Sequence, residues 1–375
     1  MAMKDVMGII YTGEKDSFLR ELTTLRAVAA VPVAGRYRVI DFLVSSFVNS
    51  DIPNVGVIMQ KNYHSLMDHL GSGKEWDLHG KTDGLFILPP FLTADNNGQY
   101  PGSLDALHAN LGYIRRSRQE YVLLCNSMIV FNADFRDMVK SYEKSGADVC
   151  MMYSKNPELQ RSEYGAYLDI DDSGMIVDVE IDPTKPRYEN TALEVTLLRK
   201  DLLINLIDRG VSHGYHDLMR HVFQRMIRDA GLRVAGYEYK KPCYRIDSIQ
   251  SYFKFNMDVI RPEVRQSLFS DDRPVYTKLR DEMPARYLEH ANVSDSIVAD
   301  GCIVDAKVTR SVLFRGVRIG KGARIKNCII MQDSIVEESV ELENCILDKQ
   351  AVIKAGGKLI GPPSYPIVIS KNMTI

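Results

Sequence analysis

Charged residues crowd the turn in which an α/β protein would be expected to bind a phosphate. Residues 6–11 are apolar enough to form a buried strand, and Gly13 follows them almost directly. Backbone N–H groups in a glycine-bearing turn at the start of a helix can hold an anion. In this chain the next residues include Glu14 and Asp16, whose carboxylates would repel a triphosphate and crowd the backbone. The turn is therefore predicted to be a poor phosphate site.

Cysteine spacing argues against a zinc centre. The six cysteines contain no C-x-x-C pair and have no histidine close by, as shown by their positions, 125, 150, 243, 302, 328 and 345. Free, mostly buried thiols are the expectation.

The chain divides into two parts with different sequence patterns, and these predict the elements that position the charged residues. With 375 residues and 45% hydrophobic residues, the chain is long enough for two or three domains with sizeable cores. The first part alternates apolar runs with amphipathic stretches, which is typical of a mostly parallel sheet covered by helices. The expected strands are 6–11, 55–59, 121–125, 148–153 and 233–237, and the expected helices are 40–49, 104–115 and 217–229.

From about residue 293 the sequence repeats with a step of 17. The triplets that begin at Ser311, Cys328 and Cys345 correspond to one another, and two further sets of triplets keep the same step. Each group of 17 residues holds three short strands about six residues apart, which predicts a triangular left-handed parallel β-helix. A β-sandwich with evenly spaced strands is the alternative.

Histidine positions bear on one activity found in β-helix proteins. An acyltransferase of this kind needs a histidine in the coils to remove a proton from the acceptor. No histidine is expected inside the coils, because the eight lie at 64, 69, 79, 108, 213, 216, 221 and 290. Acyl transfer is therefore disfavoured, and any catalysis is expected on the N-terminal domain.

Charge and hydropathy exclude other classes. The 47 basic and 49 acidic residues give a net charge of −2, so neither a nucleic acid nor an acidic membrane surface is an expected partner. No apolar run approaches the length of a membrane-spanning helix, and the first 15 residues lack the features of a signal peptide. A cytoplasmic location is expected.

Residues 22–42, LTTLRAVAAVPVAGRYRVIDF, closely resemble the opening of bacterial glucose-1-phosphate adenylyltransferases, also called ADP-glucose pyrophosphorylases. Further similarity lies in residues 60–67, 71–78 and 102–106 and in the repeats, so the resemblance covers essentially the whole chain. It implies a nucleotidyltransferase-like (Rossmann-like) α/β domain at 1–250, a connector at 251–289 and a left-handed β-helix at 290–375.

The charged groups of the family's mechanism are replaced in this sequence. The resemblance places Ser127 and Arg245 where the family has its two magnesium-binding aspartates. A serine cannot replace a carboxylate as a magnesium ligand, and a cation would oppose the ion. An arginine and a lysine of the family become Phe18 and Val28, and a glycine of the sugar region becomes Glu194. The sugar-phosphate lysine aligns with either Asp182 or Lys185, depending on a gap.

Other positions retain the family's residue types. Gly13, Gln60, Gly102, Ser103 and Asp105 match positions that contact the nucleotide, although they could equally be kept for folding. The resemblance also implies an anionic-activator site between the domains. Its candidate residues are Arg26, Arg36 and Arg38, with a salt-bridged or solvated segment as the alternative.

These replacements resemble the GlgD-type subunit found beside the catalytic subunit in Gram-positive glycogen synthesis. The expected function is therefore a catalytically deficient regulatory subunit that associates with the catalytic subunit, as a heterotetramer, and could form homo-oligomers alone. No metal or cofactor is expected. The alternative is an active enzyme that makes ADP-glucose from ATP and glucose 1-phosphate with Mg²⁺.

Overall fold

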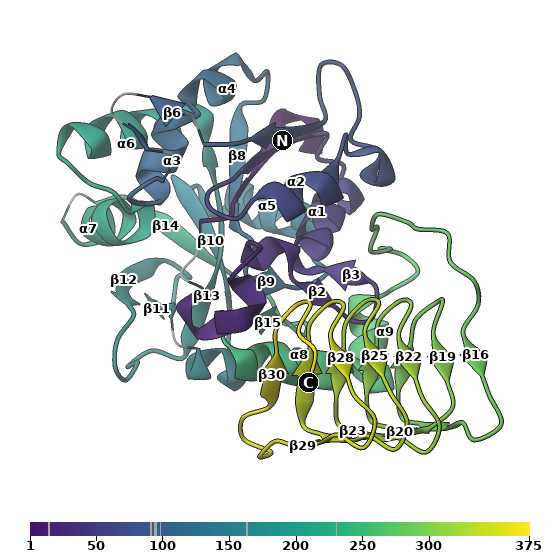
Figure 1. The fold of residues 1–375 in the computed structure, drawn as a ribbon. Helices are drawn as coiled ribbons and strands as arrows, with labels where there is room; N and C mark the ends of the chain where they lie inside the picture. The colour runs from purple at the N-terminus through teal and green to yellow at the C-terminus, as the bar shows by residue number, and fades with distance from the viewer. Residues whose placement is uncertain (14–15, 91, 94–95, 98, 163, 230) are drawn as a thin grey trace.

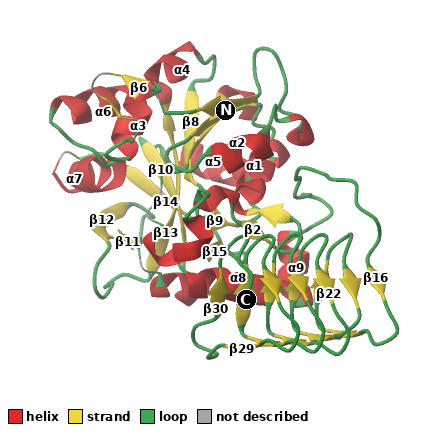
Figure 2. Ribbon diagram, in the orientation of Figure 1, coloured by secondary structure: helices red, strands yellow, loops and turns green. Residues whose placement is uncertain are grey.

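The computed structural model describes residues 1–13, 16–90, 92–93, 96–97, 99–162, 164–229 and 231–375. An α/β domain forms the first part, and a stack of short strands forms the second, with the C-terminus in the last coils (Figure 1). Colouring by secondary structure separates the helix-covered sheet from the helix-free stack (Figure 2). The expected fold class is confirmed.

The central sheet has nine strands within the described residues. Seven run in the order β12-β11-β13-β8-β1-β4-β5, while β10 pairs with both β13 and β14. The β1, β4, β5 and β8 strands are parallel, but β13 runs antiparallel to β8, β10 and β11. The sheet is therefore mixed on one side. The strands are β1 (Val6–Tyr11), β4 (Asn54–Ile58), β5 (Leu85–Leu88), β8 (Tyr121–Asn126), β10 (Val149–Ser154), β11 (Ala166–Ile170), β12 (Ile176–Ile181), β13 (Asn190–Arg199) and β14 (Val234–Glu238).

Helices cover both faces of this sheet. One apolar cluster joins the sheet to α1 (Val39–Asn49), α2 (His64–Leu70) and α5 (Phe135–Ser145). The second cluster, on the other face, contains residues of four helices and of a π-helical turn. These are α3 (Ser103–Ala109), α4 (Leu111–Arg116), α6 (Lys200–Ser212), α7 (Gln224–Asp229) and the turn Leu218–Phe223. The helix expected over 104–115 is thus divided at Asn110, and the one over 217–229 begins as a π-helix.

Close packing of α1 on the sheet requires a glycine in β1. A Cβ atom on Gly8 would lie 2.7 Å from the ring of Phe47, which is shorter than a van der Waals contact. Gly8 therefore lets a buried helix, with nine of its eleven residues inaccessible to solvent, approach the strand closely.

The repeats form the predicted β-helix. Its three parallel five-stranded sheets lie within residues 286–369, all of which the structure describes. Cα partners such as Val312, Ile329 and Ile346 keep the step of 17. The corners take the left-handed conformation in the same step, as at Arg310, Asn327 and Asn344. The three sheets contain β16 (Arg286–Tyr287), β19 (Ile303–Val304), β22 (Arg318–Ile319), β25 (Ile335–Val336) and β28 (Val352–Ile353); β17 (Asn292–Ser294), β20 (Lys307–Thr309), β23 (Arg324–Lys326), β26 (Glu341–Glu343) and β29 (Lys358–Ile360); and β18 (Ile297–Val298), β21 (Val312–Leu313), β24 (Ile329–Ile330), β27 (Cys345–Leu347) and β30 (Ile367–Ile369).

One expectation about this β-helix is wrong. His290 lies between β16 and β17 and is therefore part of the first coil, because the coils begin earlier than the sequence pattern indicated. Its ring Nδ1 atom lies 3.1 Å from a carboxylate oxygen of Asp305 on the next coil. The absence of a histidine from the coils is thus no longer an argument against acyl transfer.

The segment between the two domains begins with two helices and continues without helix from residue 269 to β16. It contains α8 (Ile249–Val259), which crosses the expected domain boundary at 250, and α9 (Pro262–Leu268). Buried side chains of α8, including Tyr252 and Phe255, belong to one apolar cluster with Phe314 and Ile329 of the β-helix. This continuous core joins the α/β domain to the β-helix.

All six cysteines are free and buried, as expected. Among the described residues, none of the helices has the length and apolarity needed to cross a membrane.

Candidate functional site

A cavity of about 340 Å³ opens where β1 and β8 end. Ile9 and Tyr11 come from β1, Leu124 to Asn126 from β8, and Glu194 and Thr196 from β13. The loop at residues 100–103 and the start of the π-helical turn also line the cavity, together with Gln60, residues 164–166, Ile181, Asp182 and Arg245. This is the edge at which α/β proteins bind ligands, because the strand ends present their side chains and loops there. We call this cavity the cleft.

Gly13 and Gln60 meet in the wall of the cleft. A Cβ atom on Gly13 would lie 1.9 Å from the side-chain oxygen of Gln60 and 2.2 Å from the hydroxyl of Tyr11. Tyr11 donates a hydrogen bond of 3.0 Å to that oxygen, and the Gln60 amide donates one of 2.8 Å to the carbonyl of Tyr100. Both ends of the Gln60 amide are thus used within the protein, and Gly13 leaves room for them. Glu14, expected to make this turn acidic, lies outside the described residues.

The segment 102–105 is tied to the start of the π-helical turn. A Cβ atom on Gly102 would lie 2.2 Å from the carbonyl oxygen of His216, and the Ser103 hydroxyl accepts a hydrogen bond of 3.0 Å from the Leu218 N–H. A carboxylate oxygen of Asp105 lies 3.0 Å from Nδ1 of His216. Gly102 and Ser103 line the cleft, whereas Asp105 does not. These contacts fit the structural alternative for the segment.

Arg245 reaches the cleft from β15 (Tyr244–Arg245), which pairs with β9 (Ile129–Val130). Its Nη1 atom lies 2.8 Å from a carboxylate oxygen of Glu194 and also donates to the carbonyl of Tyr164. Its Nη2 atom donates to the carbonyl of Ala192 over 2.9 Å. The Arg245 side chain is 3% exposed, and its two terminal nitrogens are bonded to protein groups, whereas its buried Nε atom has no hydrogen-bond partner among the described residues.

Glu194 makes this ion pair from a strained backbone. Its φ is +53°, in the left-handed region that favours glycine. Such a conformation costs on the order of 1–3 kcal/mol for a residue with a side chain and persists where the surroundings enforce it. The sequence showed that Glu194 replaces a glycine of the related family, but the pairing of its carboxylate with Arg245 was not foreseen.

The other replaced positions are also built into the protein. Ser127 is 1% exposed and does not line the cleft, although Asn126 and Met128 do. The ring of Phe18 packs on Tyr164 with 5.7 Å between centroids. Val28 is buried in the core that joins the domains.

The charges that line the cleft are unsuited to a magnesium–phosphate complex. Three carboxylates, from Asp182, Glu194 and Asp217, and one guanidinium, from Arg245, give a formal charge of −2. Asp182 accepts from Arg220 over 2.9 Å, and Lys185 does not line the cleft. Among the described residues, no three His, Cys, Asp or Glu side chains gather in a way that could hold a metal ion. With a buried serine and a paired arginine at the two relevant positions, the donor set does not fit Mg²⁺.

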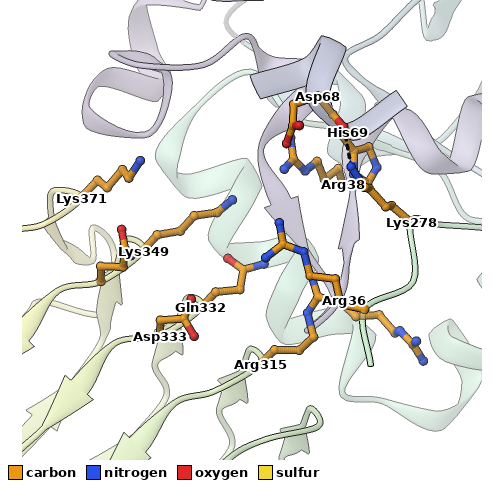
Figure 3. Close-up of a pocket in the computed structure, with 12 residues that line it drawn as sticks. Arg36, Arg38, Asp68, His69, Lys278, Arg315, Gln332, Asp333, Lys349 and Lys371 are labelled. Carbon is orange, nitrogen blue, oxygen red and sulfur yellow. Dashed lines mark hydrogen bonds between the residues drawn. The ribbon is translucent and has the colours of Figure 1, made fainter. Parts of the chain in front are cut away.

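A second cavity, of about 190 Å³, lies between the α/β domain and the β-helix (Figure 3). We call it the interdomain cavity. Arg36 and Arg38 line it, as expected for an anion site, and five further cations from the connector and the β-helix join them. Among the described residues that line the cavity, two carboxylates, of Asp68 and Asp333, oppose these seven cations. The cations that sequence reasoning missed, because only folding gathers them, are Lys278, Arg280, Arg315, Lys349 and Lys371.

Arg26, the third candidate, does not line this cavity. Its guanidinium forms two parallel hydrogen bonds, of 2.9 and 2.8 Å, with the carboxylate of Asp348 in the β-helix. Both side chains are nearly inaccessible, at 4% and 1% exposed. For Arg26 the salt-bridged alternative therefore describes the structure, and the pair ties the two domains together beside the interdomain cavity.

Burial and positive charge in the interdomain cavity lower the pKa of two of its side chains. Burial, followed by the charges of Arg38 and Arg26, lowers the pKa of Lys349 to about 7. Burial also lowers the pKa of Arg38 to about 10, with Arg26 and Arg280 adding to the effect. Crowded cations of this kind would be stabilised by a bound anion.

Comparison with known proteins places the chain in a family. Residues 7–238 match the nucleotidyl transferase family, and residues 283–362 match the family described as GlmU-like, C-terminal hexapeptide. The chain is 33% identical to the glycogen biosynthesis protein GlgD of Bacillus subtilis, over 100% of this chain and 98% of that protein. It is 34% identical to the glucose-1-phosphate adenylyltransferase of Thermomicrobium roseum, over 95% of this chain and 84% of that protein. A GlgD of Geobacillus stearothermophilus is 35% identical over 85% of this chain and 82% of its own length. The chain therefore belongs to the nucleotidyl transferase family, in the group that comprises the glucose-1-phosphate adenylyltransferases and the GlgD proteins.

Proposed function

We propose that this protein is a regulatory, catalytically deficient subunit of ADP-glucose pyrophosphorylase in bacterial glycogen biosynthesis. It would act in the cytoplasm by associating with a catalytic subunit, as a heterotetramer, and it could form homo-oligomers when alone. Neither a cofactor nor a metal is needed for this role.

The Arg245–Glu194 ion pair is the observation that carries the proposal. Nucleotidyl transfer depends on charge stabilisation by carboxylate-held metal ions and by cations on the phosphates. The resemblance puts Arg245 at one of those carboxylate positions, and its guanidinium has its hydrogen bonds to Glu194, Tyr164 and Ala192. A phosphate entering the cleft would meet a formal charge of −2 and a cation that is already paired.

The interdomain cavity supports a regulatory role for an anionic metabolite. With seven cations and two carboxylates, the interdomain cavity has a net positive lining, whereas the lining of the cleft is net negative. Arg38 and Lys278 donate hydrogen bonds to Ser65 and to the Asp68 carbonyl, but the side chains of the other five cations have neither a hydrogen bond nor an ion pair with another described residue. A multiply charged anion such as a phosphorylated metabolite would supply the missing partner.

The Arg26–Asp348 pair offers a physical link from this cavity to the α/β domain. Asp348 directly precedes Lys349, and Arg26 directly precedes the segment of Val28 that borders a small cavity with Gly13. An anion bound at Lys349 could shift this pair, and the regulated state would be passed on through contacts with the catalytic subunit. Such coupling requires that the two states bind the partner unequally.

Pyrophosphate release is the assay that tests the proposal. The purified chain would be supplied with ATP, glucose 1-phosphate and Mg²⁺, first alone and then with increasing amounts of a catalytic subunit. The proposal predicts negligible release from the chain alone and a changed rate or effector response of the mixture. Substantial turnover by the chain alone would overturn it.

The alternative is an active glucose-1-phosphate adenylyltransferase. Its support is the 34% identity to the protein of that name from Thermomicrobium roseum. That activity would require Mg²⁺ and the displacement of Arg245 from Glu194, so it predicts turnover and metal binding without any partner.

A further inference from the structure

Lys349 and Lys371 are the two lysines of the interdomain cavity whose ammonium groups have no hydrogen bond or ion pair with another described residue. Lys349 follows β27 and extends from the β-helix side toward the α/β domain (Figure 3). Its ammonium forms no hydrogen bond or ion pair with any described residue, whereas Lys278 donates to the backbone carbonyl of Asp68 over 2.7 Å. The side chain is thus partly buried without a carboxylate partner, among guanidinium groups.

These surroundings favour the uncharged amine. Desolvation and the positive charges of Arg38, Arg26 and Lys371 disfavour the ammonium form, and Asp348, whose carboxylate is bound to Arg26, opposes them only in part. With a pKa of about 7, about half of the Lys349 side chains are neutral at pH 7, against about 0.04% for a lysine of ordinary pKa, about 10.4. A neutral, desolvated lysine is a nucleophile.

The same cavity carries the charges and hydrogen-bond donors that suit a phosphoryl group. Arg36, Arg38 and Arg315 line it together with Lys349, and guanidinium groups bind phosphate oxygens through charge-assisted hydrogen bonds. A small molecule that carries an electrophilic carbon next to a phosphate would therefore be held with that carbon near the amine.

We infer that Lys349 is a site of acylation by small acyl phosphates, such as acetyl phosphate. The amine lone pair attacks the acyl carbon, the bond from that carbon to the phosphate oxygen breaks, and inorganic phosphate leaves. The nitrogen loses one proton to the departing phosphate or to water, so the products are a neutral amide and phosphate. Neither an oxidant nor a reductant takes part.

Acylation would change the charge of the interdomain cavity. The amide cannot be protonated near neutral pH, so a side chain that is charged about half of the time at pH 7 becomes permanently neutral and bulkier. The inference concerns the reactivity of Lys349 and does not depend on the regulatory function proposed above. If that function holds, the modification would weaken the binding of an anionic effector.

Peptide mass spectrometry tests this on the unmodified full-length chain. The protein is incubated with acetyl phosphate at pH 7, and the rate of acetylation is measured at each lysine. Lys371 in the same cavity and Lys354, which pairs with Glu337 on the surface, serve as internal references. A less basic amine is also a weaker nucleophile, so the rate advantage of Lys349 should be smaller than its gain in the fraction of free amine. We expect Lys349 to be acetylated at least about ten-fold faster than Lys354.

Inorganic pyrophosphate provides the second arm. It should slow the reaction of Lys349 with acetyl phosphate and leave Lys354 unaffected, because it occupies the cations that hold the reagent. Acetylation of Lys349 at the rate of Lys354 or more slowly would overturn the inference. A preference for Lys349 that pyrophosphate does not reduce would also overturn it, since the site would then not be directed by phosphate. Neither result would bear on pyrophosphate release by the proposed complex.

Discussion

The Nη1 atom of Arg245 lies 2.8 Å from the Oε1 atom of Glu194, and this contact joins two residues that each replace a group of the related family. Arg245 stands where the resemblance places an aspartate, and Glu194 where it places a glycine. A buried cation needs a counter-charge, and the left-handed backbone of Glu194 is the strain that accompanies it. The two replacements are physically coupled.

Replacing Glu194 by glycine removes both the backbone strain and the carboxylate that pairs with Arg245. The Glu194→Gly variant removes the left-handed strain, but it leaves the Arg245 guanidinium buried without its carboxylate. Loss of a buried partner is the larger effect, so we expect a net loss of about 1–2 kcal/mol in the free energy of unfolding. Urea unfolding measures it.

Glu194→Gln is the matched control for that change. It keeps the strained backbone and removes the charge, so it should be at least as destabilising as Glu194→Gly. A Glu194→Gly protein more stable than the wild type would show that the ion pair contributes less than the strain.

Restoring the two aspartates should not restore catalysis. In the variant Ser127→Asp with Arg245→Asp, Phe18 still packs on Tyr164, and Val28 still occupies the position of a lysine. The cations that would neutralise the phosphates therefore remain absent. We expect less than about one hundredth of the rate of a catalytic subunit assayed in parallel.

A triple variant that adds Glu194→Gly to these two changes tests the same expectation, that catalysis stays absent, without the Glu194 carboxylate next to the new aspartate at position 245. Circular dichroism would establish that both variants fold. Pyrophosphate release at the rate of a catalytic subunit, from either variant, would contradict the argument that the phosphate-binding cations are required.

Periodicity made the fold more predictable than the site. The step of 17 in the repeats reports a stacked register directly, as the pairing of Val312 with Ile329 confirms. The antiparallel β13 was not foreseen, because an apolar strand has the same pattern in either direction. Likewise, Arg36 and Arg38 could be assigned to an anion site from the resemblance. Lys349 and Arg315 could not, since only the docking of the β-helix brings them to those arginines.

Breaking the Arg26–Asp348 pair should destabilise the whole protein. Asp348→Asn leaves a guanidinium that is 4% exposed without its counter-charge. The expected loss is about 3–5 kcal/mol in the free energy of unfolding, measured in urea.

An exposed ion pair supplies the control for this experiment. Arg115 and Asp208 lie 3.1 Å apart, with side chains 54% and 48% exposed, so Asp208→Asn should cost less than about 0.5 kcal/mol. Equal losses from Asp348→Asn and Asp208→Asn would show that burial gives the interdomain pair no special weight. Combining Arg26→Met with Asp348→Leu should be less harmful than Asp348→Asn alone.

Anion binding should follow the cations of the interdomain cavity. Isothermal titration with inorganic pyrophosphate should detect binding that weakens at least about ten-fold in Arg36→Gln with Arg315→Gln, because each guanidinium supplies charge-assisted hydrogen bonds. Arg115→Gln, on the surface of α4, should leave the affinity unchanged. Equal affinity in the double variant and the wild type would place the anion elsewhere.

The low pKa of Lys349 predicts how stability depends on pH. Its pKa is about 7 in the folded protein and about 10.4 in the unfolded chain. Between these values the unfolded state binds more protons, so the contribution of Lys349 makes the free energy of unfolding rise with pH, by at most about 1.4 kcal/mol per pH unit. Below pH 7 both states are protonated, and the penalty for burying the ammonium is fully present.

Comparing the wild type with Lys349→Met separates the pH-dependent contribution of Lys349 to the free energy of unfolding from that of the other groups that titrate. Urea unfolding from about pH 6.5 to about pH 9.5, which brackets the pKa of about 7, should show that the methionine variant is favoured most at low pH. Its advantage should shrink as the pH rises, because the wild-type lysine is then buried in its neutral form. Lys371→Met tests whether any cation of the cavity behaves in this way. A stability difference between Lys349→Met and the wild type that stays constant with pH would show that Lys349 is not the group that loses its proton near neutrality.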